Sequence, residues 1–139
     1  MPKPLFKVGA VLLLVIITGA TTSFVLGADE KSPLRITGTY SDMRYVPDAG
    51  DVIGTEIKIV FTGKGFQGAL QIAEGSPGTL MLVEVEQKGN SISFSIPEDS
   101  PYAGAFHGSI SGSVLRGDFQ FKTGGSQAVV LRKGKSYWD

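Results

Sequence analysis

Few side chains in this sequence are suited to acid–base or nucleophilic chemistry. It contains one histidine, His107, and no cysteine, so a Ser-His-Asp or Cys-His site would have to use His107. By strand alternation His107 faces away from Phe106 and Ile110, which puts it on the solvent side. Because a triad needs several convergent partners, we predict that His107 is a surface residue without a catalytic role.

Motifs for catalysis or metal binding are missing as well. There is no Gly-x-Ser-x-Gly elbow before a helix pattern and no Ser-x-x-Lys, and zinc needs several His or Cys ligands. Acidic residues gather in two predicted loops, as Asp42, Asp48 and Asp51 and as Glu98 and Asp99. The ligand order of an EF-hand is absent, and nothing singles out a pair of carboxylates for cleaving glycosides. We predict solvated loop acids, no catalytic residue, no metal and no cofactor.

Binding residues are expected in loops carried by a rigid scaffold. The two longest predicted loops contain Tyr45 and Tyr102, and Glu74 ends a predicted strand beside Gly75. The candidate ligand-binding residues are therefore Met43, Arg44, Tyr45, Glu74 and Tyr102. The alternative is that such a loop aromatic plugs the end of the domain, because small barrels are often filled by side chains.

The first residues resemble an export signal. Lys3 and Lys7 precede an uncharged apolar run at 8–17, and small residues follow up to Ala28. This order is typical of a secretory signal peptide. We expect cleavage after Ala28, with Ala20 as a second option, which gives a signal peptide at 1–28, a linker at 29–33 and a domain at 34–139. The alternative is an uncleaved anchor, because residues 8–26 are just long enough to span a bilayer.

The remaining domain must fold without disulfides. Removing residues 1–28 takes away two of the 13 basic residues and none of the 13 acidic ones, which leaves a net charge of −2. This charge does not favour nucleic acid or anionic lipid as a partner. A domain of about 110 residues buries roughly two-thirds of its unfolded surface, which is enough for a core of its own.

Period-two alternation between turn signals predicts an all-β domain without helices. The predicted strands are 34–41, 54–62, 66–73, 79–87, 91–96, 105–110, 114–123 and 127–132. Connections of hairpin length make neighbours antiparallel. We predict one core from the apolar face, made of Ile57, Ile59, Phe61, Met81, Val83, Val85, Ile92, Phe94, Ile96, Phe119 and Phe121.

An even number of strands in a meander can close on itself and lose both edges. We therefore favour an eight-stranded antiparallel up-and-down β-barrel over a two-sheet sandwich. Closure pairs the last strand with the first and brings Arg132 or Lys133 near Tyr40, where a cation over the ring is worth about 0.5–2 kcal/mol. Trp138 is expected to pack over the same end, unless the tail is frayed.

The pattern apolar-x-Gly-x-apolar occurs four times, centred on Gly38, Gly68, Gly108 and Gly117. Glycine weakens a strand, so its recurrence on the apolar face suggests bending or close packing at barrel corners. Room for a ligand inside the barrel is the alternative.

In layout, residues 34–133 resemble the calycin group, the lipocalin-like and avidin-like barrels. Gly38-Thr39-Tyr40 stands where lipocalins have Gly-x-Trp on the first strand, and Arg132 or Lys133 stands where their basic partner lies on the last. Tyrosine in place of tryptophan is a departure. The resemblance implies a fold, and a fold does not by itself transfer function.

The sequence thus favours an exported module, periplasmic or secreted, that binds a small apolar ligand or a protein partner and is not an enzyme. It would touch the membrane only through residues 8–26, if these are uncleaved. The alternative is a small outer-membrane β-barrel, but its strands need about 9–11 residues and an apolar outer band.

Overall fold

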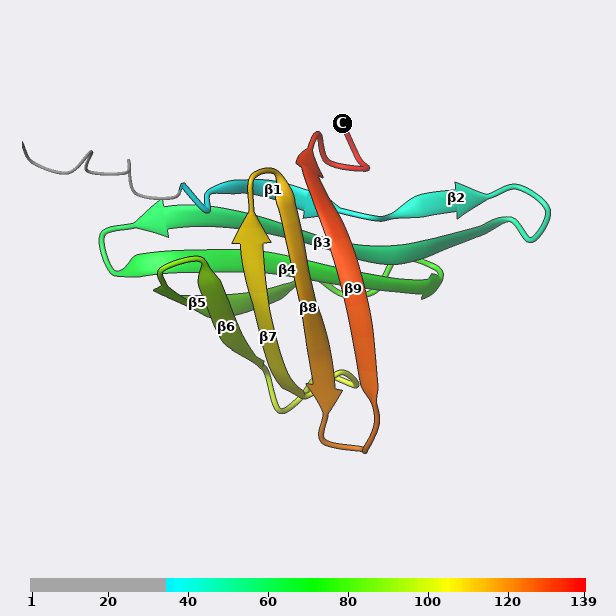
Figure 1. Cartoon of the computed structure of the whole chain (residues 1–139). Coiled ribbons are helices and arrows are strands. Elements are labelled where there is room, and N and C mark those ends of the chain that lie inside the picture. The colour runs from blue at the N-terminus through cyan, green and yellow to red at the C-terminus, as the bar shows by residue number, and fades with distance from the viewer. Residues whose placement is uncertain (1–34) are drawn as a thin grey trace, which may run out of the picture. The chain divides into compact units, whose positions relative to one another are not determined.

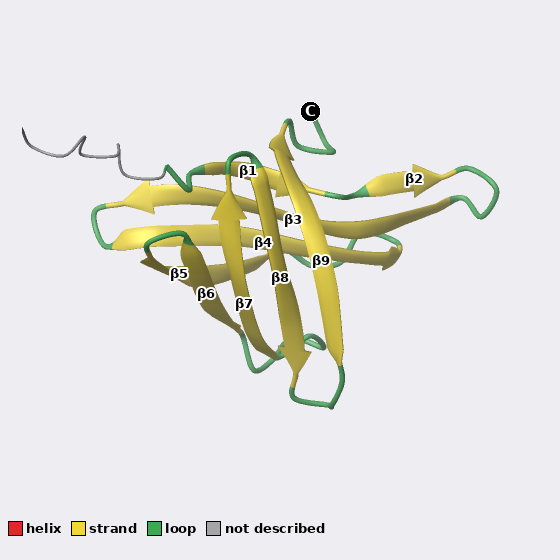
Figure 2. Ribbon diagram, viewed as in Figure 1, coloured by secondary structure: helices red, strands yellow, loops and turns green. Residues whose placement is uncertain are grey.

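The computed structural model of this chain describes residues 35–139. The predicted signal peptide and the linker lie outside the described residues. Within 35–139 all regular structure is strand (Figure 2), and no helix there is long and apolar enough to cross a membrane.

Nine strands follow one another along the chain (Figure 1). They are β1 (Gly38–Ser41), β2 (Arg44–Val46), β3 (Asp51–Thr62), β4 (Gly65–Gly75), β5 (Met81–Lys88), β6 (Ser91–Ile96), β7 (Gly104–Ser111), β8 (Val114–Phe121) and β9 (Ser126–Gly134).

The strands form one closed antiparallel sheet. From β3 to β9 each strand pairs with the next, and β1 pairs with both β3 and β9. β1 and β2 keep one register along β3, with Ser41 opposite Glu56 and Arg44 opposite Ile53, so together they count as a single barrel strand. The predicted eight-stranded up-and-down barrel is confirmed, and it forms in place of the two-sheet sandwich.

Residues 42–51, predicted as a loop, form most of a β-arm instead. β2 pairs with the start of β3, and only residues 47–50 turn the chain. At the junction of β1 and β2, the Thr55 amide donates to Asp42 Oδ1 at 2.6 Å. Across from it Gly54 has φ +116°, and a Cβ there would lie 2.8 Å from Met43 Cα. The Pro47 and Gly50 signals therefore marked a tight turn and not a long loop.

Side chains fill the barrel interior. Three phenylalanines pack at its centre, with ring centroids 4.8 Å apart for Phe94–Phe106 and 4.9 Å apart for Phe106–Phe119. The Phe106 ring lies over the paired glycines Gly108 and Gly117, where an added Cβ would approach Phe106 Cζ to 2.7 and 2.4 Å. At these two positions the repeated glycine makes room for a neighbouring ring.

The predicted core is correct except near two strand ends. The assignment of Phe61 to the core is wrong, because its side chain is 66% exposed. Its ring packs edge-on against that of Phe66, with centroids 5.1 Å apart, near the tip of the β3–β4 hairpin. β3 runs past its last partner on β1, at Ile59, so no strand covers Phe61 from that side. Phe121 is only partly buried.

The predicted aromatic residue, Tyr40, lies on β1 where this strand pairs with β9 and closes the barrel. Tyr40 is fully buried, and its hydroxyl donates to the Ile36 carbonyl at 3.0 Å. Lys133 is its partner across β1 and β9, and Lys133 Nζ lies 5.6 Å from the centre of the Tyr40 ring. Arg132 is opposite Ser41 and is exposed.

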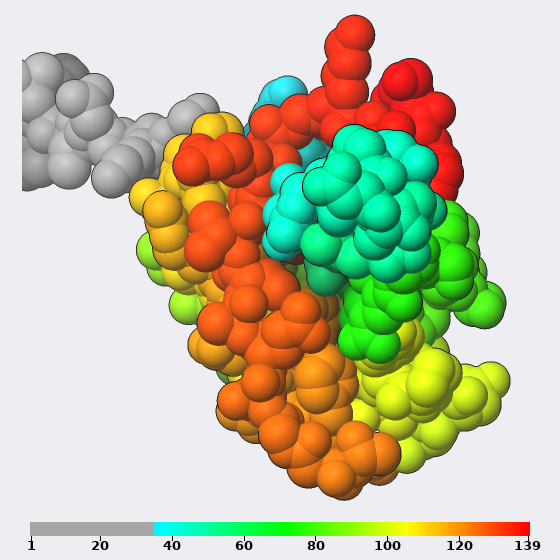
Figure 3. Space-filling view, turned by 90° about the vertical axis from the view of Figure 1, so that its right-hand side faces the viewer, coloured from blue at the N-terminus to red at the C-terminus, as the bar shows by residue number. Residues whose placement is uncertain are grey.

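The C-terminal residues lie on the outside of the barrel wall. Glu56, 8% exposed, accepts hydrogen bonds from Ser136 Oγ at 2.5 Å and from the Tyr137 amide at 2.8 Å. Trp138 Nε1 donates to Gln71 Oε1 at 2.9 Å. Trp138 therefore packs beside β4 while staying 53% exposed. Figure 3 shows this segment in red beside the β2–β3 arm.

Candidate functional site

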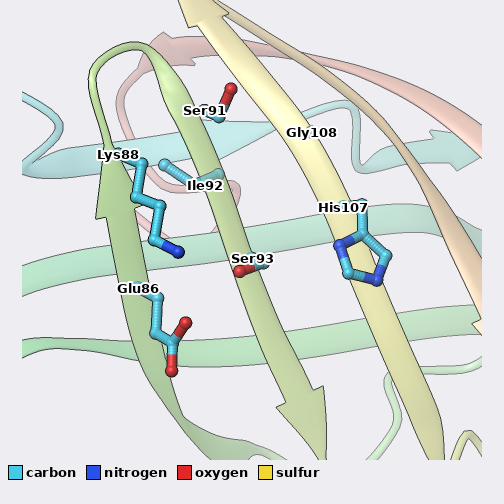
Figure 4. A pocket seen from close by; sticks show the side chains of 7 residues that line it. All are labelled: Glu86, Lys88, Ser91, Ile92, Ser93, His107 and Gly108. Carbon is cyan, nitrogen blue, oxygen red and sulfur yellow. The ribbon is translucent and has the colours of Figure 1, made fainter.

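The single histidine belongs to a polar row on the outer face. Glu86, Ser93, His107 and Asp118 are successive cross-strand partners on β5, β6, β7 and β8. Figure 4 shows the first three of them around a hollow of about 280 Å³, which Lys88 also lines.

This row brings together Ser, His and Asp without the geometry of a triad. Among residues 35–139, no hydrogen bond joins His107 to Ser93 or to Asp118. His107 and Asp118 are exposed on an open wall, whereas a nucleophile needs its base within hydrogen-bond reach. The arrangement therefore gives no support to nucleophilic catalysis.

Two of the predicted binding residues lie at one end of the barrel. Tyr102, from the loop between β6 and β7, packs against the core with its ring 6.2 Å from that of Phe121. Glu74 continues the inward-facing series of β4 past the barrel end, and its carboxylate raises the pKa of the Tyr102 hydroxyl. Burial is the main cause of the raised pKa of Tyr102, and the interaction with the Glu74 carboxylate raises this pKa further. Tyr102 thus acts as a plug.

The other predicted binding residues lie around the arm. Met43 is buried, with 8% exposure, so its side chain is not free for a ligand. Arg44 is exposed and stands two strands from Glu74, in the row Arg44–Ile53–Glu74. Tyr45, 54% exposed, alternates to the opposite face of the arm. Glu74 and Tyr102 therefore lie close together, and Arg44 lies on the same face of the sheet as Glu74. Met43 and Tyr45 lie apart from these three residues.

A larger hollow lies beside the plug, between the entry to β5 and the loop that carries Tyr102. We call it the β5 groove. Its volume is about 590 Å³, within the range of ligand sites. Leu80 and Leu82 on its wall are 58% and 74% exposed. The lining residues are Gly78, Thr79, Leu80, Met81, Leu82, Pro97, Asp99, Ser100, Pro101 and Tyr102.

Hydrogen bonds hold both walls of the β5 groove in place. On one wall the Gly78 amide donates to the Ile72 carbonyl at 3.0 Å, and Gln71 Nε2 donates to the Gly78 carbonyl at 2.8 Å. A Cβ at residue 78 would lie 2.4 Å from the Ile72 oxygen, so the close approach requires glycine. On the other wall, Ser100 Oγ donates to Met81 Sδ at 2.9 Å and accepts from the Tyr102 amide at 3.0 Å.

The loop acids do not converge on a metal site. Asp42 is used at the junction of β1 and β2, and Glu98 pairs with Lys122. Among the described residues, no group of three or more His, Cys, Asp or Glu side chains is placed to hold a metal ion.

Sequence reasoning missed Leu80 and Leu82. Leu82 lies on the face of β5 that Glu84 and Glu86 make polar, and Leu80 directly precedes the strand, so both break the alternation that assigns apolar residues to the core. The run Leu80-Met81-Leu82 was the available signal, because an apolar residue on the polar face has no core to fill.

Comparison of the chain with protein-family models, with curated proteins and with solved structures finds no match.

Proposed function

We propose that this chain is an exported, non-enzymatic binding module that takes its ligand in the β5 groove and not inside the barrel. The exposure of Leu80 and Leu82 beside a hollow of about 590 Å³ carries the proposal. Large apolar side chains in a preformed concavity are typical of binding sites. The packed phenylalanines of the core fill the barrel interior.

The proposal keeps the calycin-like barrel as a scaffold but moves the ligand to its outside. In support, Tyr102 packs against the core at the barrel end and Phe106 occupies the space above Gly108 and Gly117. We expect an apolar ligand, because leucine and methionine side chains line the groove. Asp99 is the acidic residue of the lining.

Native mass spectrometry of the full chain purified without refolding tests this proposal. A bound molecule should be present in the wild type and lost in Leu80→Ser and Leu82→Ser. Val130→Thr is the matched control, because Val130 is also exposed, at 46%, but lies on β9 away from the groove. Equal binding by all four proteins would contradict the proposal.

A small outer-membrane barrel is the weaker alternative. Its lipid-facing side would have to be apolar, whereas the outward positions of this barrel include the exposed residues Lys58, Glu84, Arg116 and Asp118. The exported module would be supported if the protein is extracted without detergent and its intact mass corresponds to a chain that begins at Asp29. A protein that needs detergent and retains residues 1–28 would favour an anchored form.

A further inference from the structure

The barrel wall splays between β5 and β6. The two strands pair only at their hairpin end, where Glu86, Gln87 and Lys88 face Ser93, Ile92 and Ser91. On its other side β5 stays paired with β4 down to Met81. From Met81 to Val85, β5 therefore has a ladder on one side only.

The unpaired backbone groups can be identified from the register. In a two-residue hairpin the residues that flank the turn exchange hydrogen bonds, and the exchanging pairs then alternate. Lys88 and Glu86 thus direct their amides and carbonyls toward β6, and so must Glu84 and Leu82. In the described chain these last two residues have no ladder partner on that side.

The outer face of this free edge has a defined chemistry. Leu80 and Leu82 stand at one end and Glu84 and Glu86 follow, all exposed. Neither glutamate forms an ion pair within residues 35–139. Natural sheets protect open edges with lysine, proline or a covering loop. Here the loop that carries Pro97 and Pro101 lines the far side of the β5 groove and leaves Leu80 and Leu82 exposed.

We propose that the free edge of β5 binds an extended segment of a partner polypeptide, which adds a strand at Leu82 and Glu84. A row of unpaired amides and carbonyls is complementary to an extended backbone, and such strand addition is a common mode of peptide recognition. Apolar side chains of the segment would lie beside Leu80 and Leu82, and a basic one beside Glu84 or Glu86, because cross-strand neighbours of opposite charge attract. The inference rests on the proposed function and names the class of ligand.

The test uses the full chain and linear peptides selected against it from a random phage-displayed library. Each selected peptide is synthesised in two forms, with N-methyl groups on one or the other alternate set of amides. Strand addition uses only one set, so one form should bind at least about tenfold more weakly and the other should bind as before.

Variants of the protein provide the second half of the test. Leu82→Pro removes the edge-facing amide but none of the ladder to β4, since only odd-numbered β5 residues exchange hydrogen bonds with β4. It should weaken binding more than Leu82→Thr, which keeps the amide. Amide hydrogen exchange at Leu82 and Glu84, measured in the wild type, should be fast in the free protein and slow in the complex.

Two results would overturn the inference. One is peptide binding that tolerates both methylation patterns or leaves the Leu82 and Glu84 amides unprotected. The other is the selection of no linear peptide at all. If the groove nevertheless retains a small molecule that Leu82→Ser releases, the inference fails and the proposed function stands. If that molecule is also missing, both fail.

Discussion

Replacing Gly68 by alanine tests whether the barrel interior is filled or leaves room for a ligand. Gly68 is buried on the inner face of β4, and a Cβ there would lie 2.9 Å from Ile57 Cδ1 and 3.0 Å from Val83 Cγ2. Overpacking costs about 1–3 kcal/mol. Alanine also restricts the unfolded chain, which returns about 0.4–1 kcal/mol. We expect a net loss of about 0.5–2 kcal/mol in the free energy of unfolding.

A second substitution makes this prediction specific to one contact. Ile57→Val removes the methyl group nearest to the new Cβ and should by itself cost about 0.5–1.5 kcal/mol. Together the two changes move one methyl group between neighbouring positions, so the double variant should lose less than about 1.5 kcal/mol. The effects would then fall short of additivity by about 1 kcal/mol.

Urea unfolding followed by circular dichroism measures all four proteins. Ile59→Val is the matched control, because Ile59 is as buried as Ile57 and is the ladder partner of Gly68, but none of the three atoms nearest to the added Cβ belongs to it. Its effect should add to that of Gly68→Ala within about 0.5 kcal/mol. A neutral Gly68→Ala, or additivity with Ile57→Val, would refute the filled interior and reopen a ligand chamber inside the barrel.

Three further predictions concern the core, the tail and the plug. Phe119→Ala should cost about 3–5 kcal/mol in urea unfolding, since Phe119 is 1% exposed among aromatic neighbours; a loss below about 1 kcal/mol would contradict its burial. Glu56→Ala should release the tail, so that the emission of Trp138 shifts to the red and iodide quenches it more strongly; an unchanged spectrum would contradict the contact. Glu74→Gln should lower the pKa of Tyr102 in an ultraviolet absorbance titration yet leave it above 10.0, because burial is the larger cause; an unchanged pKa would contradict the interaction with the Glu74 carboxylate. Because the raised pKa means that the folded form holds its proton longer, Tyr102 contributes stability that is complete below pH 10 and is lost as the pH rises through the folded pKa.

Local alternation was enough to predict every strand except β2, and to predict the closure of the barrel. Ser91–Ile96 was predicted with the bounds that β6 has, because three apolar residues alternate with three serines between clear turn signals. Alternation fixes which face a residue takes, but not how far the neighbouring strand extends beside it. Phe61 shows this limit, since it has the parity of Ile57 and Ile59 and yet lies beyond the end of β1.

The candidate site was less predictable, because it depends on contacts between distant segments. Glu74 and Tyr102 were each identified from a position at a strand end or in a loop, but the sequence does not show that they meet. The β5 groove depends on where the β5–β6 ladder stops, and residues 79–87 contain no turn signal at that point. The tail contact with Glu56 joins residues 80 apart in the chain.

The position of the exposed leucines relative to the ladder is the strongest reason to treat the β5 groove as functional. Exposure alone does not mark a site, because Phe61 is also 66% exposed, on a part of β3 that pairs with β4 alone, but it does not line the β5 groove. Closing a barrel pairs most of the edges of its sheet. β5 nevertheless lacks a partner where it separates from β6, as β3 does past Ile59 and β9 before Arg132 on the side of β1. At that edge Leu82 is 74% exposed, next to a concave surface whose walls are fixed by hydrogen bonds. An added strand would pair the unpaired backbone groups of β5, cover the exposed leucine side chains and fill the preformed hollow.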